Sequence, residues 1–221
     1  MSKEEHFLVN PELNSYINEK LPILLSESDR GAVLIGISQI DNELQKLLEI
    51  IAPEDMTNKE KKWIERATLA SKLNIAYTCR LLPRNIFESI NKLKQIRNDV
   101  AHNLEVFNLD DYDDLLKEIF ESLGDGVSVF IHNISIKYMV EQAITIMLKS
   151  KHNDKPILED RIAAINHISE NKTTQNIIEK PVIKMKLAVG ILFISGIIIY
   201  ERKKTLEIVQ ENKTFSSIKI S

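Results

Sequence analysis

The sequence lacks the motifs that commonly indicate a disulfide, a phosphate-binding loop or a metal site. Among its 221 residues there is a single cysteine, Cys79, which excludes an intrachain disulfide and a cysteine-based metal site. It has neither a Walker-type loop nor a Gly-x-Gly-x-x-Gly pattern, so no phosphate-binding loop is predicted. Because its histidines also show no metal-type spacing, we predict neither a metal ion nor a cofactor.

Glycine and proline are scarce, with six of each, which argues against an all-β protein because such a fold needs many turns. Basic side chains are not in excess either: 29 Lys and Arg accompany 32 Asp and Glu, for a net charge of −3. This balance weakens any case for broad DNA binding, which needs a concentrated basic surface, and leaves room only for a local basic patch. The N-terminus is polar and acidic rather than a secretory signal, so we expect a cytoplasmic protein.

Long apolar runs are also rare, and the main one extends from Leu187 to Tyr200 without a charge. As a helix these 14 residues would be about 21 Å long, short of the roughly 30 Å hydrocarbon core of a membrane. Gly190, Ser195 and Gly196 lower its hydrophobicity further. We therefore predict a buried core helix and no membrane contact.

Apolar residues recur at helical spacing along most of the chain, which predicts an all-α fold. The clearest stripe covers residues 29–51, follows the capping residue Ser28 and is ended by Pro53. A second clear stripe covers residues 85–102. Further helices are predicted over residues 11–20, 69–81, 110–123, 134–149, 157–168 and 181–204. Residues 127–131 alternate poorly, and we predict a short extended piece there.

No internal repeat or low-complexity linker divides the chain, so a single multi-helix bundle is the simplest organisation. We assign residues 28–204 to this bundle. Residues 1–27 form an N-terminal extension with a short helix, and residues 205–221 form a C-terminal tail that is irregular or adds a short strand.

A basic cluster around one aromatic residue occupies residues 57–66, which we predict to be a loop or a short surface helix. The aromatic residue is Trp63, and its charged neighbours are Lys59, Lys61, Lys62 and Arg66. Such a combination can contact nucleic acid. The alternative, which we favour, is a solvated turn with Trp63 docked on the core.

The most informative segment is Ile96-Arg97-Asn98-Asp99-Val100-Ala101-His102, at the end of a predicted helix. Asn98 and His102 are four residues apart and share a helix face, whereas Arg97 and His102 lie about 140° apart around an ideal helix. Arg97 and His102 can still converge where the helix ends, or where a second subunit brings its own copy opposite. A helix C-terminus also favours a cation at this position.

Two interpretations of this segment remain open. Histidine as acid or base, with arginine holding a phosphate, is suited to metal-free phosphodiester cleavage, and Asp99 would orient or oppose either group. In the structural interpretation Arg97 and Asp99 pair with other helices, Asn98 bonds a neighbouring backbone and His102 caps carbonyls. A lone Arg-x4-His pattern is weak, so the residues alone favour the structural interpretation.

Several segments resemble a known family in the same order along the chain. Residues 28–36, Ser-Asp-Arg-Gly-Ala-Val-Leu-Ile-Gly, with Ile40-Asp41-Asn42-Glu43-Leu44, resemble the opening helix of the mannitol operon repressor (MltR-like) family. Residues 70–77 resemble its next helix and residues 96–102 its "IRNxxAH" segment. The resemblance covers roughly residues 28–103, with weaker support at 180–204, and residues 104–180 do not match.

The segment at 96–102 also resembles the Arg-x4-6-His motif of the HEPN superfamily, which includes RNA-cleaving toxins and noncatalytic binding modules. This resemblance implies a helical bundle that often dimerises around the motif. It places Arg97 and His102 at the catalytic pair and Asn98 at the polar position beside it. The resemblance to the repressor family implies transcriptional control through protein partners. We find no helix-turn-helix or basic recognition helix, so we expect no direct sequence-specific DNA binding.

Two functional hypotheses follow. The first is a non-enzymatic cytoplasmic regulatory protein that acts as a helical homodimer by binding a protein partner in transcriptional control. The second is a HEPN-type metal-independent endoribonuclease, a toxin or defence RNase, with RNA as its partner. Its catalytic residues would be Arg97 and His102, with Asn98 and Asp99 beside them.

Overall fold

The computed structural model describes residues 11–102, 107–149 and 182–216, and within these ranges all regular structure is helical. The elements in chain order are α1 (Pro11–Ser26), α2 (Asp29–Ile51), α3 (Asn58–Arg66), α4 (Leu69–Thr78), α5 (Arg84–His102), the 3₁₀ turn η2 (Leu109–Tyr112), α6 (Asp113–Ser122), α7 (Val127–Lys149) and α10 (Val182–Ser216). The predicted all-α bundle is therefore confirmed.

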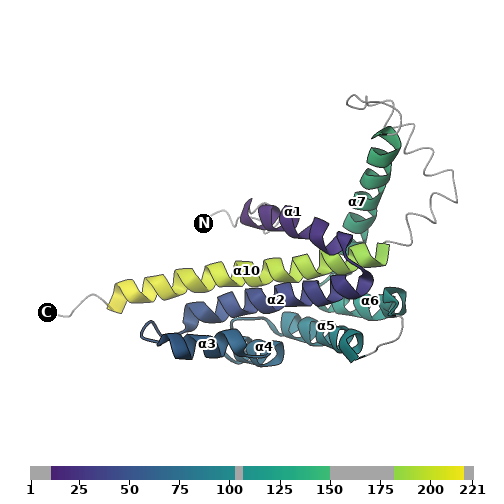
Figure 1. Ribbon diagram of the computed structural model, residues 1–221. Helices are drawn as coiled ribbons and strands as arrows, with labels where there is room; N and C mark the ends of the chain where they lie inside the picture. The colour runs from purple at the N-terminus through teal and green to yellow at the C-terminus, as the bar shows by residue number, and fades with distance from the viewer. Residues whose placement is uncertain (1–10, 103–106, 150–181, 217–221) are drawn as a thin grey trace.

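Helices α2 and α10 run side by side and form the long axis of the bundle (Figure 1). Helix α1 packs on one side of this pair, and α4, α5 and α6 cover the other side. Helix α7 contacts α6 and α10 and then projects away from the rest of the bundle. The core therefore lies mainly between α2, α10 and α5.

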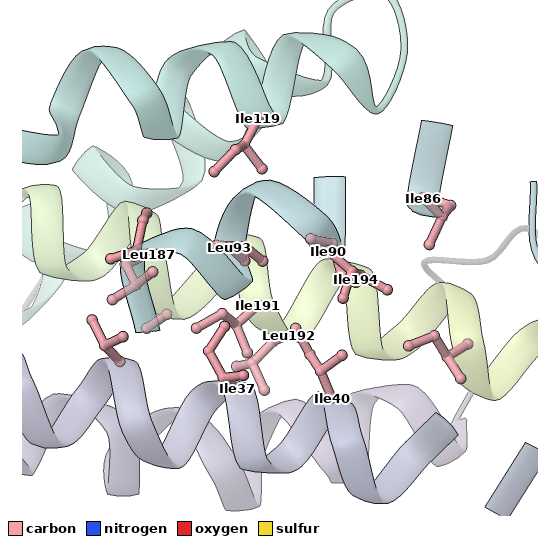
Figure 2. Packing of buried hydrophobic residues seen from close by; sticks show 14 of the residues in the cluster. Ile37, Ile40, Ile86, Ile90, Leu93, Ile119, Leu187, Ile191, Leu192 and Ile194 are labelled. Atoms are coloured by element: carbon pink, nitrogen blue, oxygen red, sulfur yellow. The ribbon is translucent and has the colours of Figure 1, made fainter. Parts of the chain in front are cut away.

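The core is built from aliphatic side chains at helical spacing. Figure 2 shows Ile37 and Ile40 of α2 facing Ile191 and Leu192 of α10, with Leu93 of α5 nearby. Each of these five side chains is buried. Complete burial of one aliphatic side chain of this size contributes roughly 1.5–3 kcal/mol, so this interface stabilises the fold strongly.

Two glycines allow the helices around α10 to approach closely. A Cβ atom added at Gly36 of α2 would lie closer than 3.0 Å to the terminal methyl of Ile191. A Cβ atom added at Gly190 of α10 would lie equally close to two ring carbons of Phe120 on α6. A larger residue at either position would push the packed helices apart.

The strongest helix predictions are confirmed nearly to the residue. Helix α2 spans the predicted 29–51, and the Oγ of Ser28 accepts a hydrogen bond from the backbone N–H of Gly31 at 3.0 Å. Helix α5 begins one residue earlier than predicted and ends at His102 as predicted. A turn at residues 124–126 separates α6 from α7, with φ of 146° at Gly124 and 78° at Gly126.

Two predictions in the C-terminal half are wrong. Residues 127–131 are not extended but form the start of α7, because Phe130 packs near Phe193 of α10 and Ile131 is fully buried. The predicted tail is helical over residues 205–216, since α10 continues without a break to Ser216. The predicted helix at 157–168 and the end of the tail at 217–221 lie outside the described residues.

The N-terminal half differs from prediction at two helix ends. Helix α1 runs through Pro22 to Ser26 rather than stopping near residue 20, and Leu24 is buried in the common core. Helix α4 ends at Thr78, before the predicted end near Pro83. Its last turn is closed by Arg80 with a φ of 60°, a left-handed conformation that ends a helix.

Segment 57–66 contains a short helix, and its tryptophan is exposed rather than docked on the core as we predicted. Helix α3 is capped by Thr57, whose Oγ1 accepts from the N–H of Glu60 while the Glu60 carboxylate accepts from the N–H of Thr57. Ile64 rather than Trp63 packs against the core, and Trp63 is 66% exposed. The prediction that Trp63 docks on the core is therefore wrong.

Helix α10 is long and apolar enough to cross a membrane, because Val182–Glu211 spans 30 residues and its most apolar 18-residue window has a mean hydropathy of 2.2. The length argument from residues 187–200 alone therefore fails, since the helix continues on both sides. Burial supports the core interpretation, since 67% of the most apolar window is covered by the rest of the protein. The segment is thus the central core helix of this bundle.

Candidate functional site

The polar residues at the end of α5 are exposed because the apolar stripe of this helix holds their neighbours inside. Ile96 and Val100 are fully buried against the bundle. The helical period then directs Arg97, Asn98 and Asp99 outward, and His102 is exposed in the last turn. All four sequence-predicted site residues therefore lie on the surface at one end of α5.

Contacts among these side chains are few. The Arg97 Nη1 donates to the Asn98 Oδ1 across 3.4 Å, at the outer limit of a hydrogen bond. The hydroxyl of Tyr112 donates to the Asp99 Oδ2 at 3.2 Å. Burial, and then the neighbouring Asp99 carboxylate, raise the pKa of the Tyr112 hydroxyl above its usual value. Asp99 is thus engaged by the 3₁₀ turn rather than by Arg97 or His102.

A groove of about 750 Å³ opens beside Arg97 and Asn98, between α2, α5 and the start of α4. Lys94, one helical turn before Arg97, lines the same groove, so two cations of α5 face it. Leu34 and Ile37 of α2 supply an apolar wall. His102 is not among the lining residues.

The carboxylate in this groove, Asp41 of α2, is already balanced by a cation. The Nζ of Lys72 lies 3.0 Å from the Asp41 Oδ2 and 3.3 Å from the Gln45 Oε1. Lys72 is only 1% exposed, so its ammonium group interacts with this carboxylate rather than with a ligand in the groove. The Asp41 Oδ1 is buried without a hydrogen-bond partner in the part of the chain that the structure describes. The net charge of the groove therefore comes from Lys94 and Arg97.

The structure brings only part of the predicted site together. Arg97 and Asn98 share a groove, Asp99 binds Tyr112, and His102 stands apart from the groove. In a single chain this arrangement provides phosphate-binding cations beside the Asp41 carboxylate, which Lys72 already pairs, and His102 does not face them. An acid–base pair would need a second copy of the chain to supply the missing partner.

Sequence reasoning missed Lys94, Asp41 and Lys72. Lys94 could have been found, because its spacing of three from Arg97 places both on one helix face. The pair Asp41–Lys72 could not, because 31 residues separate the partners and only tertiary packing joins them.

Residues 11–102, 107–149 and 182–216 contain no cluster of three or more His, Cys, Asp or Glu side chains that could hold a metal ion. The one cysteine, Cys79, is exposed at the end of α4.

Comparison with known proteins adds no family to this description. No protein-family model, no curated protein and no solved structure matches this chain. The resemblance to the mannitol operon repressor family and to the HEPN superfamily therefore stays a prediction from the quoted residues.

Proposed function

We propose that this chain is a non-enzymatic regulatory protein that acts by binding through the exposed end of α5. The observation that carries this proposal is the division of the four polar side chains. Arg97 and Asn98 line a groove, Tyr112 holds Asp99, and His102 lies outside the groove. Such an arrangement suits recognition of a partner better than acid–base chemistry, which needs its groups around one reacting atom.

The wider role rests on the resemblance to the repressor family. It consists of transcriptional control in the cytoplasm, exerted by a homodimer that binds a protein partner. Because we expect from the sequence no direct sequence-specific DNA binding, the proposed partner is a protein rather than operator DNA.

The alternative is a metal-independent endoribonuclease, and one observation favours it. Arg97 and His102 are both exposed, so a second subunit could place its own histidine against the arginine. A composite site of this kind would cleave RNA without a divalent ion.

Incubation with bulk RNA in EDTA separates the two functions. We expect the wild-type protein and His102→Ala to leave the RNA intact, because Arg97 and His102 lie about 140° apart on one helix. An enzyme that uses His102 as acid or base would lose roughly 100- to 10,000-fold in rate on this substitution. Cleavage by the wild type that disappears in His102→Ala would establish the endoribonuclease instead.

Oligomeric state tests the homodimer. We expect light scattering at micromolar concentration to give a mass near twice 25.4 kDa. The charge reversal Arg97→Glu should shift the protein toward the monomer if the dimer forms around the end of α5. Lys117→Glu changes an exposed side chain of α6, is the matched control and should leave the mass unchanged. A monomeric wild type that binds operator DNA by itself would contradict the proposal.

A further inference from the structure

One face of α3 carries three cations around the only tryptophan of the chain. Lys59, Lys62, Trp63 and Arg66 are all exposed, and at 100° per residue they fall within about 100° of the helix circumference. We call these four residues the basic–aromatic face. Ile64 lies on the opposite side and is packed against the core, so the direction of this face is fixed by the fold.

The cations on this face form no ion pair with the two glutamates of the helix, Glu60 and Glu65. Lys59, Lys62 and Arg66 form no ion pair with any other described residue. Glu60 is held in the capping box by Thr57, with two hydrogen bonds of 2.8 Å. The basic–aromatic face therefore presents three free cations although the whole chain carries a net charge of −3.

The C-terminal end of α3 adjoins the groove at α5. Arg66 ends α3, and the next residues, Ala67 and Thr68, line the groove that contains Lys94 and Arg97. Because Lys72 balances Asp41, these two cations are not cancelled inside the groove. The three cations of α3 are thus joined by two more, Lys94 and Arg97, in the adjoining groove.

We propose that the basic–aromatic face of α3 binds single-stranded nucleic acid. A base stacks on the exposed indole of Trp63, and the phosphates on either side contact the cations of α3 and then Lys94 and Arg97. Base stacking and phosphate contacts do not depend on the nucleotide sequence, so we expect this face to bind single strands without base specificity. This inference goes beyond the proposed function, with which it shares Lys94 and Arg97, and it requires neither a protein partner nor cleavage.

The residues of this face favour a nucleic acid strand over a membrane surface. A helix that lies on a membrane buries a stripe of several apolar side chains. Here Trp63 is the single apolar residue among cations, and Ile64 faces the core. A duplex is a poorer fit than a single strand, because its bases are stacked on each other and leave no face for the indole.

The single tryptophan makes binding directly measurable. Titration with a twelve-residue oligouridine should quench the fluorescence of Trp63. The affinity, measured by the fluorescence anisotropy of the labelled oligonucleotide, should be about ten-fold weaker for Trp63→Ala, because one stacked base is lost. The slope of log affinity against log salt should fall by about 0.7 for each cation that loses a phosphate.

Two adjacent lysines provide a matched control. Lys62→Glu reverses a charge on the basic–aromatic face, whereas Lys61→Glu makes the same change on the other side of α3, near Val209 of α10. We expect a loss of at least ten-fold for Lys62→Glu and less than two-fold for Lys61→Glu, with unchanged circular dichroism melts. Equal losses in both variants, or no quenching by the oligonucleotide, would overturn the proposal. So would a Trp63 response to anionic phosphatidylglycerol vesicles alone.

Discussion

Gly190→Ala is expected to lower the free energy of unfolding by about 2 kcal/mol. The added methyl would lie closer than 3.0 Å to two ring carbons of Phe120, and that ring is only 2% exposed and cannot move into solvent. Alanine is otherwise the better helix former by about 1 kcal/mol, so propensity alone predicts a gain in stability. Urea unfolding, followed by circular dichroism, shows whether Gly190→Ala lowers the free energy of unfolding, as the clash predicts, or raises it, as helix propensity predicts.

A second substitution tests the cause. Phe120→Leu removes the ring edge that the methyl would strike, so Gly190→Ala should cost less in this background than in the wild type. Gly36→Ala is the matched control, because its new methyl meets only one flexible terminal methyl of Ile191, and its loss should be smaller. A Gly190→Ala protein as stable as the wild type would mean that α6 and α10 are not packed as described.

A still larger effect is expected from Arg202→Met, at about 3 kcal/mol of lost stability. Arg202 of α10 binds the Glu43 Oε2 of α2 at 2.8 Å, and Lys46 binds the Oε1 at 2.7 Å. The Glu43 side chain is 3% exposed, so removal of Arg202 leaves a buried carboxylate with a single, largely exposed partner. Chemical denaturation of the variant measures the loss.

The double variant Glu43→Leu with Arg202→Met supplies the control for this pair. Replacing both charges by apolar groups of similar size leaves no uncompensated charge, so much of the lost stability should return. A double variant as unstable as Arg202→Met alone would indicate that Arg202 acts through packing rather than through Glu43.

The helices with both a cap and a continuous stripe could be predicted from sequence. Ser28 and the stripe that follows it determine α2, and the stripe of α5 determines its end at His102. The exposure of the polar residues Arg97, Asn98 and Asp99 is consistent with the same period. These features are local, so a single segment contains the information that specifies them.

The errors arose where neighbouring helices decide the outcome. Trp63 and Ile64 are adjacent, and only the contact of α3 with the core selects Ile64 as the buried residue. The extension of α10 beyond residue 204 has no clear stripe, yet Val209 lies beside Ile64 and the end of α2. The groove at α5 and the pair Asp41–Lys72 combine separate helices, so no local pattern encodes them.

The central claim is that α3 and the end of α5 are binding surfaces, that α3 binds single-stranded nucleic acid, and that neither surface cleaves RNA. The most direct measurement mixes the wild-type protein with labelled single-stranded RNA in EDTA and records Trp63 fluorescence together with RNA length. The account predicts quenching of Trp63 while the RNA stays full-length. RNA fragments that appear with the wild type and are absent with His102→Ala would contradict it.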